Sequence, residues 1–146
     1  MFKKMFVLAS VILFASLPVY AVKQKQQERL KVIITDEYNA VMYKIKPERS
    51  LTTIAYLANL DCNEYTLQRT YRTMNGIRYI VPVDIFKFSN TEPRTYVKEL
   101  LSQYDGEIYY KPLGIGHNGY YVGEMYLGDE SLNKHLVEKG YCTYIK

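Results

Sequence analysis

The segment between residues 30 and 60 limits the possible folds more than any other part of the chain. Three β-rich runs follow one another there, at 30–34, 40–45 and 51–60. Only two short turns, at 36–39 and 47–50, separate them. This spacing is typical of a three-stranded antiparallel meander, so we expect the domain to begin with a sheet.

The elements after the meander are a hairpin, a helix, two strands and a second helix. Asn75-Gly76 lies between two alternating runs, and both residues tolerate positive φ, which predicts a tight hairpin turn. Apolar residues at helical spacing predict a helix over 91–103, with Pro93 in its first turn. Strands are expected at 107–111 and 120–127, separated by a glycine-rich turn at 114–119, and a last helix over 131–139.

This order of elements predicts the fold class. A meander, a helix and two closing strands match a small five-stranded barrel of the OB type, in which the first helix lies between strands three and four. We therefore expect a mainly β, α+β domain with two or three helices. The hairpin within 65–88 is expected to be an insertion into that barrel.

The first 21 residues have the layout of a secretory signal peptide. Lys3 and Lys4 precede an apolar run at 5–17, which is too short to span a bilayer, and Val19-Tyr20-Ala21 ends the segment. We expect cleavage after Ala21, a flexible lead-in at 22–29 and one domain at 30–146. The mature protein is then exported to a periplasm or secreted, with no transmembrane segment.

Composition restricts the kinds of ligand. Removal of the two leader lysines leaves 17 basic and 15 acidic residues, a net charge of +2, so charge alone does not indicate a nucleic-acid binder. Tyrosine is abundant, with 15 of the 16 residues in the mature part. Tyr is frequent in strands and on ligand-binding surfaces, and strand packing is the simpler explanation.

Two blocks of sequence resemble the staphylococcal nuclease (thermonuclease-like) family. The stretch 131–140 reads Ser-Leu-Asn-Lys-His-Leu-Val-Glu-Lys-Gly and resembles the Asn-x-x-Leu-Val-x-x-Gly helix of that family. The stretch 57–64 reads Leu-Ala-Asn-Leu-Asp-Cys-Asn-Glu and resembles its Ile-Asp-x-Pro-Glu block. The resemblance covers most of residues 30–142.

The resemblance implies a Ca²⁺-dependent phosphodiesterase acting on DNA and RNA. Carboxylates hold the metal in that family, a Glu acts as base, and two Arg bind the phosphate. Asp61 and Glu37 would be the metal ligands here, and Glu64 the catalytic carboxylate. A rival placement of the acidic block at 83–84 puts a Lys where the Glu should be.

Both arginines of the family pattern are replaced. Tyr56 and Tyr120 stand at the two positions, and a phenol carries no charge at neutral pH. Loss of one such contact to a transition state typically costs about 3 kcal/mol. The resemblance therefore implies a pseudoenzyme unless cations come from elsewhere, for example from the inserted hairpin.

The hairpin interleaves basic and aromatic residues, a pattern suited to stacking on bases and contacting phosphates. The candidate binding residues are Arg69, Tyr71, Arg72, Arg78 and Tyr79. The alternative is an ordinary amphipathic hairpin that covers one end of the barrel.

Cys62 and Cys142 form an even pair in an exported chain, which permits one disulfide. In the resembled fold the chain leaving the last helix returns toward the 57–64 block, so the two residues would approach each other. Two separately buried thiols are the alternative.

Three functions follow from these observations. The first is a non-hydrolytic domain that binds nucleic acid, another anionic polymer or a protein. The second is an active, divergent Ca²⁺ nuclease, and the third is a structural component of an envelope complex.

Overall fold

The structure is a computed structural model that describes residues 29–64, 69–82 and 89–145. The predicted signal peptide, and the lead-in apart from Arg29, lie outside the described residues. So do parts of the predicted insertion, at 65–68 and 83–88, including the rival acidic placement. Among the described residues, no helix is both long and apolar enough to cross a bilayer.

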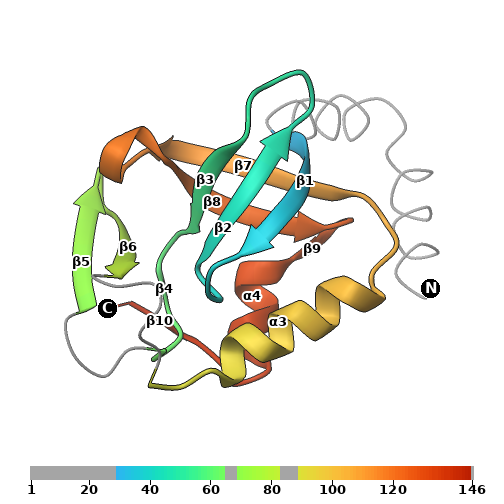
Figure 1. The fold of residues 1–146 in the computed structure, drawn as a ribbon. Coiled ribbons are helices and arrows are strands. Elements are labelled where there is room, and N and C mark those ends of the chain that lie inside the picture. Colours follow the sequence, from blue (N-terminus) through green and yellow to red (C-terminus); the bar gives the residue numbers. More distant parts are fainter. Residues whose placement is uncertain (1–28, 65–68, 83–88, 146) are drawn as a thin grey trace, which may run out of the picture.

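Five strands form a closed barrel, which confirms the predicted fold (Figure 1). The strands are listed in chain order as β1 (Leu30–Glu37), β2 (Met42–Pro47), β3 (Thr53–Leu57), β7 (Ile108–Ile115) and β8 (Tyr121–Leu127). β1, β2 and β3 pair as an antiparallel meander, and β7 pairs with both β1 and β8. Parallel pairing of β3 with β8 closes the barrel in the strand order of the OB type.

Three predicted boundaries are wrong. The run at 51–60 is not one strand, because the chain turns at Asn59, which has φ of 62°, and resumes as β4 (Leu60–Asp61). Glu37 belongs to the end of β1 rather than to the turn, which is closed by a hydrogen bond from Tyr38 N to Met42 O. β7 extends into the predicted glycine-rich turn, which leaves only a short 3-10 segment, η1 (His117–Gly119).

Tyrosines fill much of the barrel interior. Tyr43 and Tyr110 are fully buried, and their hydroxyls donate to the backbone carbonyls of Ala40 and Tyr56, each at 2.7 Å. A buried hydroxyl without a partner would be costly, so these bonds allow Tyr to serve as a large core residue. Core packing explains part of the abundance of Tyr, as expected.

Two helices cover one end of the barrel (Figure 1). They are α3 (Glu92–Gln103) and α4 (Leu132–Glu138), each within one residue of its predicted bounds. Ser131, in the two-residue β9 (Glu130–Ser131), caps α4 by accepting a hydrogen bond from Lys134 N. α3 buries Val97, and Tyr96, Leu100 and Leu101 pack against the same core.

The asparagine of the 131–140 block joins α4 to the barrel. Asn133 is 4% exposed, and its side-chain oxygen accepts from Met125 N at 3.1 Å. Its amide nitrogen donates to the carbonyls of Ala58 and Gly123, both at 3.3 Å. One side chain thus satisfies three backbone groups of β8 and of the turn after β3.

The inserted hairpin consists of β5 (Arg69–Met74) and β6 (Ile77–Pro82) and forms a separate two-stranded sheet. It turns at Asn75 and Gly76, with φ of 50° and 82°, so the predicted turn is confirmed. The hairpin is attached to the barrel through Asn59, whose side-chain oxygen accepts from Arg78 N at 3.0 Å.

Cys62 and Cys142 form a disulfide, which confirms the predicted pairing. Their Cα atoms are 3.9 Å apart, and the bridge links positions separated by 80 residues. The chain after Cys142 forms β10 (Thr143–Tyr144), which pairs with β4, and Ile145 N donates to Asn59 O at 2.9 Å. The disulfide therefore holds the C-terminal strand against the turn that also anchors the hairpin.

We predict that the double substitution Cys62→Ser and Cys142→Ser lowers the free energy of unfolding by about 4 kcal/mol, because it releases a loop of 80 residues in the unfolded chain. Denaturant unfolding of the oxidised protein and of the variant measures the difference. Equal stabilities would contradict this prediction, and intact mass confirms that the reference protein is oxidised.

We predict that Asn133→Ala lowers the free energy of unfolding by about 2–4 kcal/mol, because the buried Met125 N–H and the Ala58 carbonyl lose the bond to this side chain, whereas Gly123 O keeps its bond from Ala58 N. Glu138→Ala is the matched control on the same helix, since Glu138 is exposed and the change should stay within about 0.5 kcal/mol. Similar losses in the two variants would show that the Asn133 bonds are unimportant.

Candidate functional site

Glu64 connects three segments of the chain. Its side chain is 3% exposed, and both carboxylate oxygens accept from Ala40 N, at 2.9 and 3.1 Å, in the turn between β1 and β2. Its backbone carbonyl accepts from the amides of Ser89 and Asn90, just before α3. The predicted catalytic carboxylate thus holds together the turn and the start of the helix.

Burial raises the pKa of Glu64 from its ordinary value of 4.5 to about 7. The Ala40 N–H and the charge of Arg94 lower the pKa, and the charge of Asp61 raises it further. A carboxyl with such a pKa can exchange a proton near neutral pH. Both of its oxygens, however, already accept from one backbone N–H.

The two predicted metal ligands, Asp61 and Glu37, each accept a hydrogen bond within the protein. The Asp61 carboxylate accepts from Asn63 N at 2.8 Å and closes a turn after β4. Glu37 ends β1, and its carbonyl accepts from Arg94 Nε at 3.0 Å. Within the described part of the chain, no three Asp, Glu, His or Cys side chains lie close enough together to hold a metal ion. The assignment of Ca²⁺ to Asp61 and Glu37 stays a prediction.

Arg94 is a cation of this region that the sequence analysis did not select. It lies in the first turn of α3, bonds to the Glu37 carbonyl, and lowers the pKa of Glu64. No local pattern in the sequence predicts this contact, because Arg94 and Glu37 are 57 positions apart.

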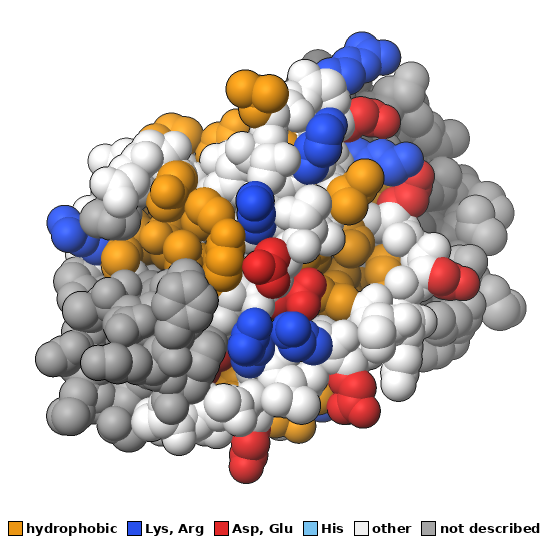
Figure 2. Space-filling view, viewed as in Figure 1, with side chains coloured by type: hydrophobic (Ala, Val, Ile, Leu, Met, Phe, Trp, Pro, Cys, Tyr) orange, Lys and Arg blue, Asp and Glu red, His pale blue; other side chains and the backbone are white. Residues whose placement is uncertain are grey.

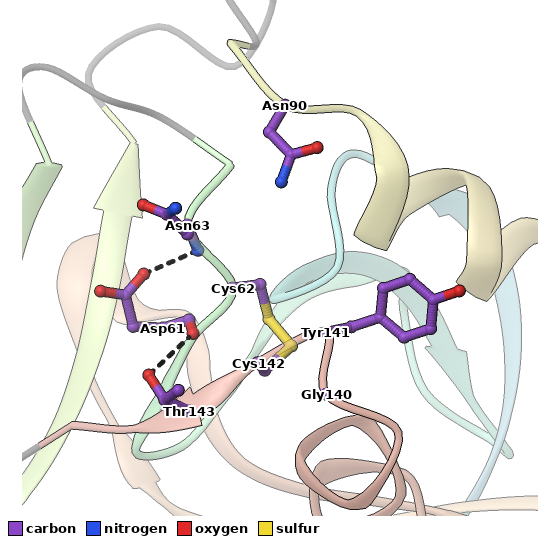
Figure 3. A pocket seen from close by; sticks show the side chains of 8 residues that line it. All are labelled: Asp61, Cys62, Asn63, Asn90, Gly140, Tyr141, Cys142 and Thr143. Carbon is purple, nitrogen blue, oxygen red and sulfur yellow. Dashed lines mark hydrogen bonds between the residues drawn. A yellow bond between two sulfur atoms is a disulfide. The ribbon is translucent and has the colours of Figure 1, made fainter.

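A hollow of about 450 Å³ lies beside the disulfide (Figure 3). Asp61 and Asn63 line one side of it, and Asn90 lies across from them. The Asn90 side chain accepts from Glu92 N, the first residue of α3, at 3.1 Å. The Tyr141 ring points away from the hollow and stacks on Tyr96 of α3, with 4.3 Å between ring centroids. The polar groups of the hollow are therefore committed largely to the chain itself.

The two tyrosines at the predicted phosphate-binding positions lie side by side. The rings of Tyr56 on β3 and Tyr120, just before β8, have centroids 6.2 Å apart. Parallel pairing of β3 with β8 brings them together, although 64 positions separate them in the sequence. Tyr79 of the hairpin also packs against Tyr56, and the centroids of these two rings are 5.2 Å apart.

Tyr56 presents its hydroxyl group at this point. The residue is 1% exposed, yet its hydroxyl makes no hydrogen bond with any described residue. Burial raises the pKa of Tyr56, and so do the Tyr120 and Tyr79 phenols, so the hydroxyl is a donor at neutral pH.

Arg72 supplies a positive charge to the tyrosine pair. It stands directly opposite Tyr79 in the hairpin, so both side chains leave the same face of the two strands. Its charge acts on the Tyr56 phenol and lowers that pKa against the larger effect of burial. Arg72 is exposed and makes no ion pair with another described residue. We call Arg72, Tyr56 and Tyr120 the seam site, because they lie where the hairpin meets the barrel.

The other hairpin candidates are placed only in part. Arg78 is exposed and lies opposite Thr73, on the face of the hairpin that alternates with that of Arg72 and Tyr79. Arg69 and Tyr71 belong to β5, but their side chains lie outside the description. The binding role of all five hairpin residues stays a prediction.

Comparison with known proteins adds no relative: no family model matches the chain, and no curated protein matches it. The fold and the site geometry are therefore the basis for any statement on function.

We predict that the stability of the protein falls as pH rises from about 4.5 to about 7, by up to about 3 kcal/mol. In this window the unfolded chain has lost the proton of Glu64 and the folded chain keeps it, so rising pH favours unfolding. Glu64→Gln, which resembles the protonated form, should remove this loss.

Denaturant unfolding at a series of pH values tests the prediction. Glu99→Gln, an exposed position on α3, is the control and should keep the wild-type dependence. An unchanged pH dependence in Glu64→Gln would show that this carboxyl does not titrate in the window.

Proposed function

We propose that this protein is an exported OB-fold domain of the staphylococcal nuclease type that binds single-stranded nucleic acid through its phosphates without cleaving it. The observation that carries the proposal is the Tyr56 hydroxyl, a donor on an almost fully buried ring that has no partner among the described residues. Tyr120 lies next to it, and Arg72 brings a charge. Two neutral donors and one guanidinium suit a phosphate oxygen.

The absence of hydrolysis follows from the same residues. A phosphodiester transition state gains charge, and fixed cations stabilise it more strongly than neutral hydroxyls do. Replacing each of two arginines by Tyr loses about 3 kcal/mol of such stabilisation. Arg72 offers one charge where the family pattern has two.

A divergent Ca²⁺ nuclease is the second candidate, favoured by the pKa of Glu64 near 7. A general base in this position would need an oxygen that reaches water or substrate, and the Glu64 side chain is 3% exposed and bonded to Ala40 N. We therefore place binding before catalysis. A protein partner or a structural role in the envelope would leave the protein without affinity for oligonucleotides.

We predict that the oxidised protein binds a fluorescent oligothymidylate with an affinity that falls as salt rises, and that it leaves the strand intact with Ca²⁺ present. Fluorescence anisotropy measures binding, and a zymogram measures cleavage. Ca²⁺-dependent cleavage that Glu64→Gln abolishes would establish the nuclease, and no binding at low salt would end the proposal.

We predict that Arg72→Gln weakens binding about tenfold or more and that Tyr56→Phe weakens it severalfold, because each removes a donor to the phosphate. Tyr56→Phe should leave the unfolding midpoint unchanged, since the hydroxyl has no partner in the described protein. Lys134→Gln, exposed on α4, controls for loss of charge.

Tyr104→Phe is the control for loss of a hydroxyl, because Tyr104 donates to Glu107 O on another part of the surface. If the two controls reduce the affinity as much as the seam variants do, binding is not located at the seam.

A further inference from the structure

The inserted hairpin covers the outer face of β2, β3 and β8. Met42 pairs with Tyr56, and Tyr56 with Val122, so these three side chains lie on one face of the three strands. They point away from the barrel interior, because their neighbours Tyr43, Ala55 and Leu57 belong to the core. All three are nevertheless at most 9% exposed.

The cover is closely fitted. Met42, Tyr56, Ala58, Tyr79 and Val122 form one buried cluster, and Met74, Ile77 and Val81 of the hairpin pack against it. Gly114 and Gly116 are part of the fit, since a methyl group at these positions would overlap Met74 and Tyr79, respectively. Figure 2 shows hydrophobic side chains gathered where the hairpin meets the barrel.

OB barrels bind oligonucleotides and oligosaccharides on this face. Their ligands lie across the second and third strands and the adjoining loops, and an OB fold typically holds about 4–16 nucleotides of a strand. Here the second and third barrel strands carry the hairpin instead, and the tilted Tyr79 ring packs against Tyr56, with 5.2 Å between the ring centroids. Within the described residues, the edge of the covered face at the seam site is the part of this face that we expect to receive a ligand.

We infer that the seam site binds a phosphate ester of one or two nucleotides and not an extended strand. This inference rests on the proposed function and specifies its ligand. An oligonucleotide binds through one short stretch, and the rest of the strand stays in solvent.

The uncovered part of the outer sheet supports the same conclusion. Lys44 and Lys46 of β2 are exposed there and could lengthen a phosphate track. Asp36 stands opposite Lys44 in β1, however, and Ile33, which is 66% exposed, stands opposite Lys46. Acidic side chains are interspersed with Lys and Arg across this side (Figure 2). On the described surface of the face shown in Figure 2, the basic side chains do not form a continuous path.

A comparison of a short and a long oligonucleotide measures how many nucleotides the site contacts. The affinities of the wild-type protein for a 5′-phosphorylated trinucleotide and for an oligothymidylate of about 20 nucleotides should agree within about threefold after correction for overlapping sites. The logarithm of the binding constant should fall with the logarithm of salt by about 0.7–1.4, as expected for one or two phosphates. Arg72→Gln should weaken both ligands by the same factor.

The double variant Lys44→Gln and Lys46→Gln is the control, and it should change neither affinity by more than about twofold. A longer strand that binds ten or more times tighter, with a salt slope of about 3 and a loss in the lysine variant, would overturn the inference while leaving the proposed function intact. Absence of binding for both ligands would overturn the proposed function and this inference with it.

Discussion

The parallel pairing of β3 with β8 is the contact on which the rest of the structure depends. It joins strands that are separated by more than half of the domain and closes the barrel. Gly123 permits this arrangement, since a Cβ there would collide with the carbonyl of Lys111 on β7. The same pairing determines the two faces of the sheet: Ala55 and Leu57 face the core, and Tyr56 and Val122 face outward.

Closure of the barrel leaves an apolar outer face that needs a cover. Tyr56 and Val122 would expose a large apolar area to water, and their burial is favourable at roughly 25 cal/mol per Å². The hairpin supplies the cover, and the Asn59 turn attaches it. That turn also accepts a hydrogen bond from Ile145 N and lies just before Cys62, which the disulfide joins to Cys142. The tyrosine cluster is therefore stabilised by contacts that begin more than 60 residues away along the chain.

Local signals in the sequence predict the elements well. Asn75-Gly76, Ser131 and the helical spacing at 91–103 each determine their own geometry, and the order of elements then restricts the topology to the barrel. Long-range contacts were harder to predict from the sequence. The bond from Ala40 N to Glu64 spans 24 positions, and that from Arg94 to Glu37 spans 57. Cys62 and Cys142 are an exception, because a resemblance to a known fold supplied their proximity. The opposition of Arg72 to Tyr79 followed from the hairpin register, but the packing of that pair on Tyr56 did not.

The proposed function places Tyr where the resembled family has Arg, and the chemistry of this exchange favours ground-state binding. A guanidinium attracts a phosphate more strongly as charge develops, which favours the transition state, whereas a phenol with a raised pKa gives one neutral hydrogen bond whose strength changes little. Tyr56 cannot move to follow a reacting group, because Tyr79 and Tyr120 enclose its ring. On the proposed function, a fixed neutral donor beside a single charge would hold a phosphate ester without lowering the barrier to its cleavage. Such a site would discriminate between ligands by the space at its edge, which the hairpin determines.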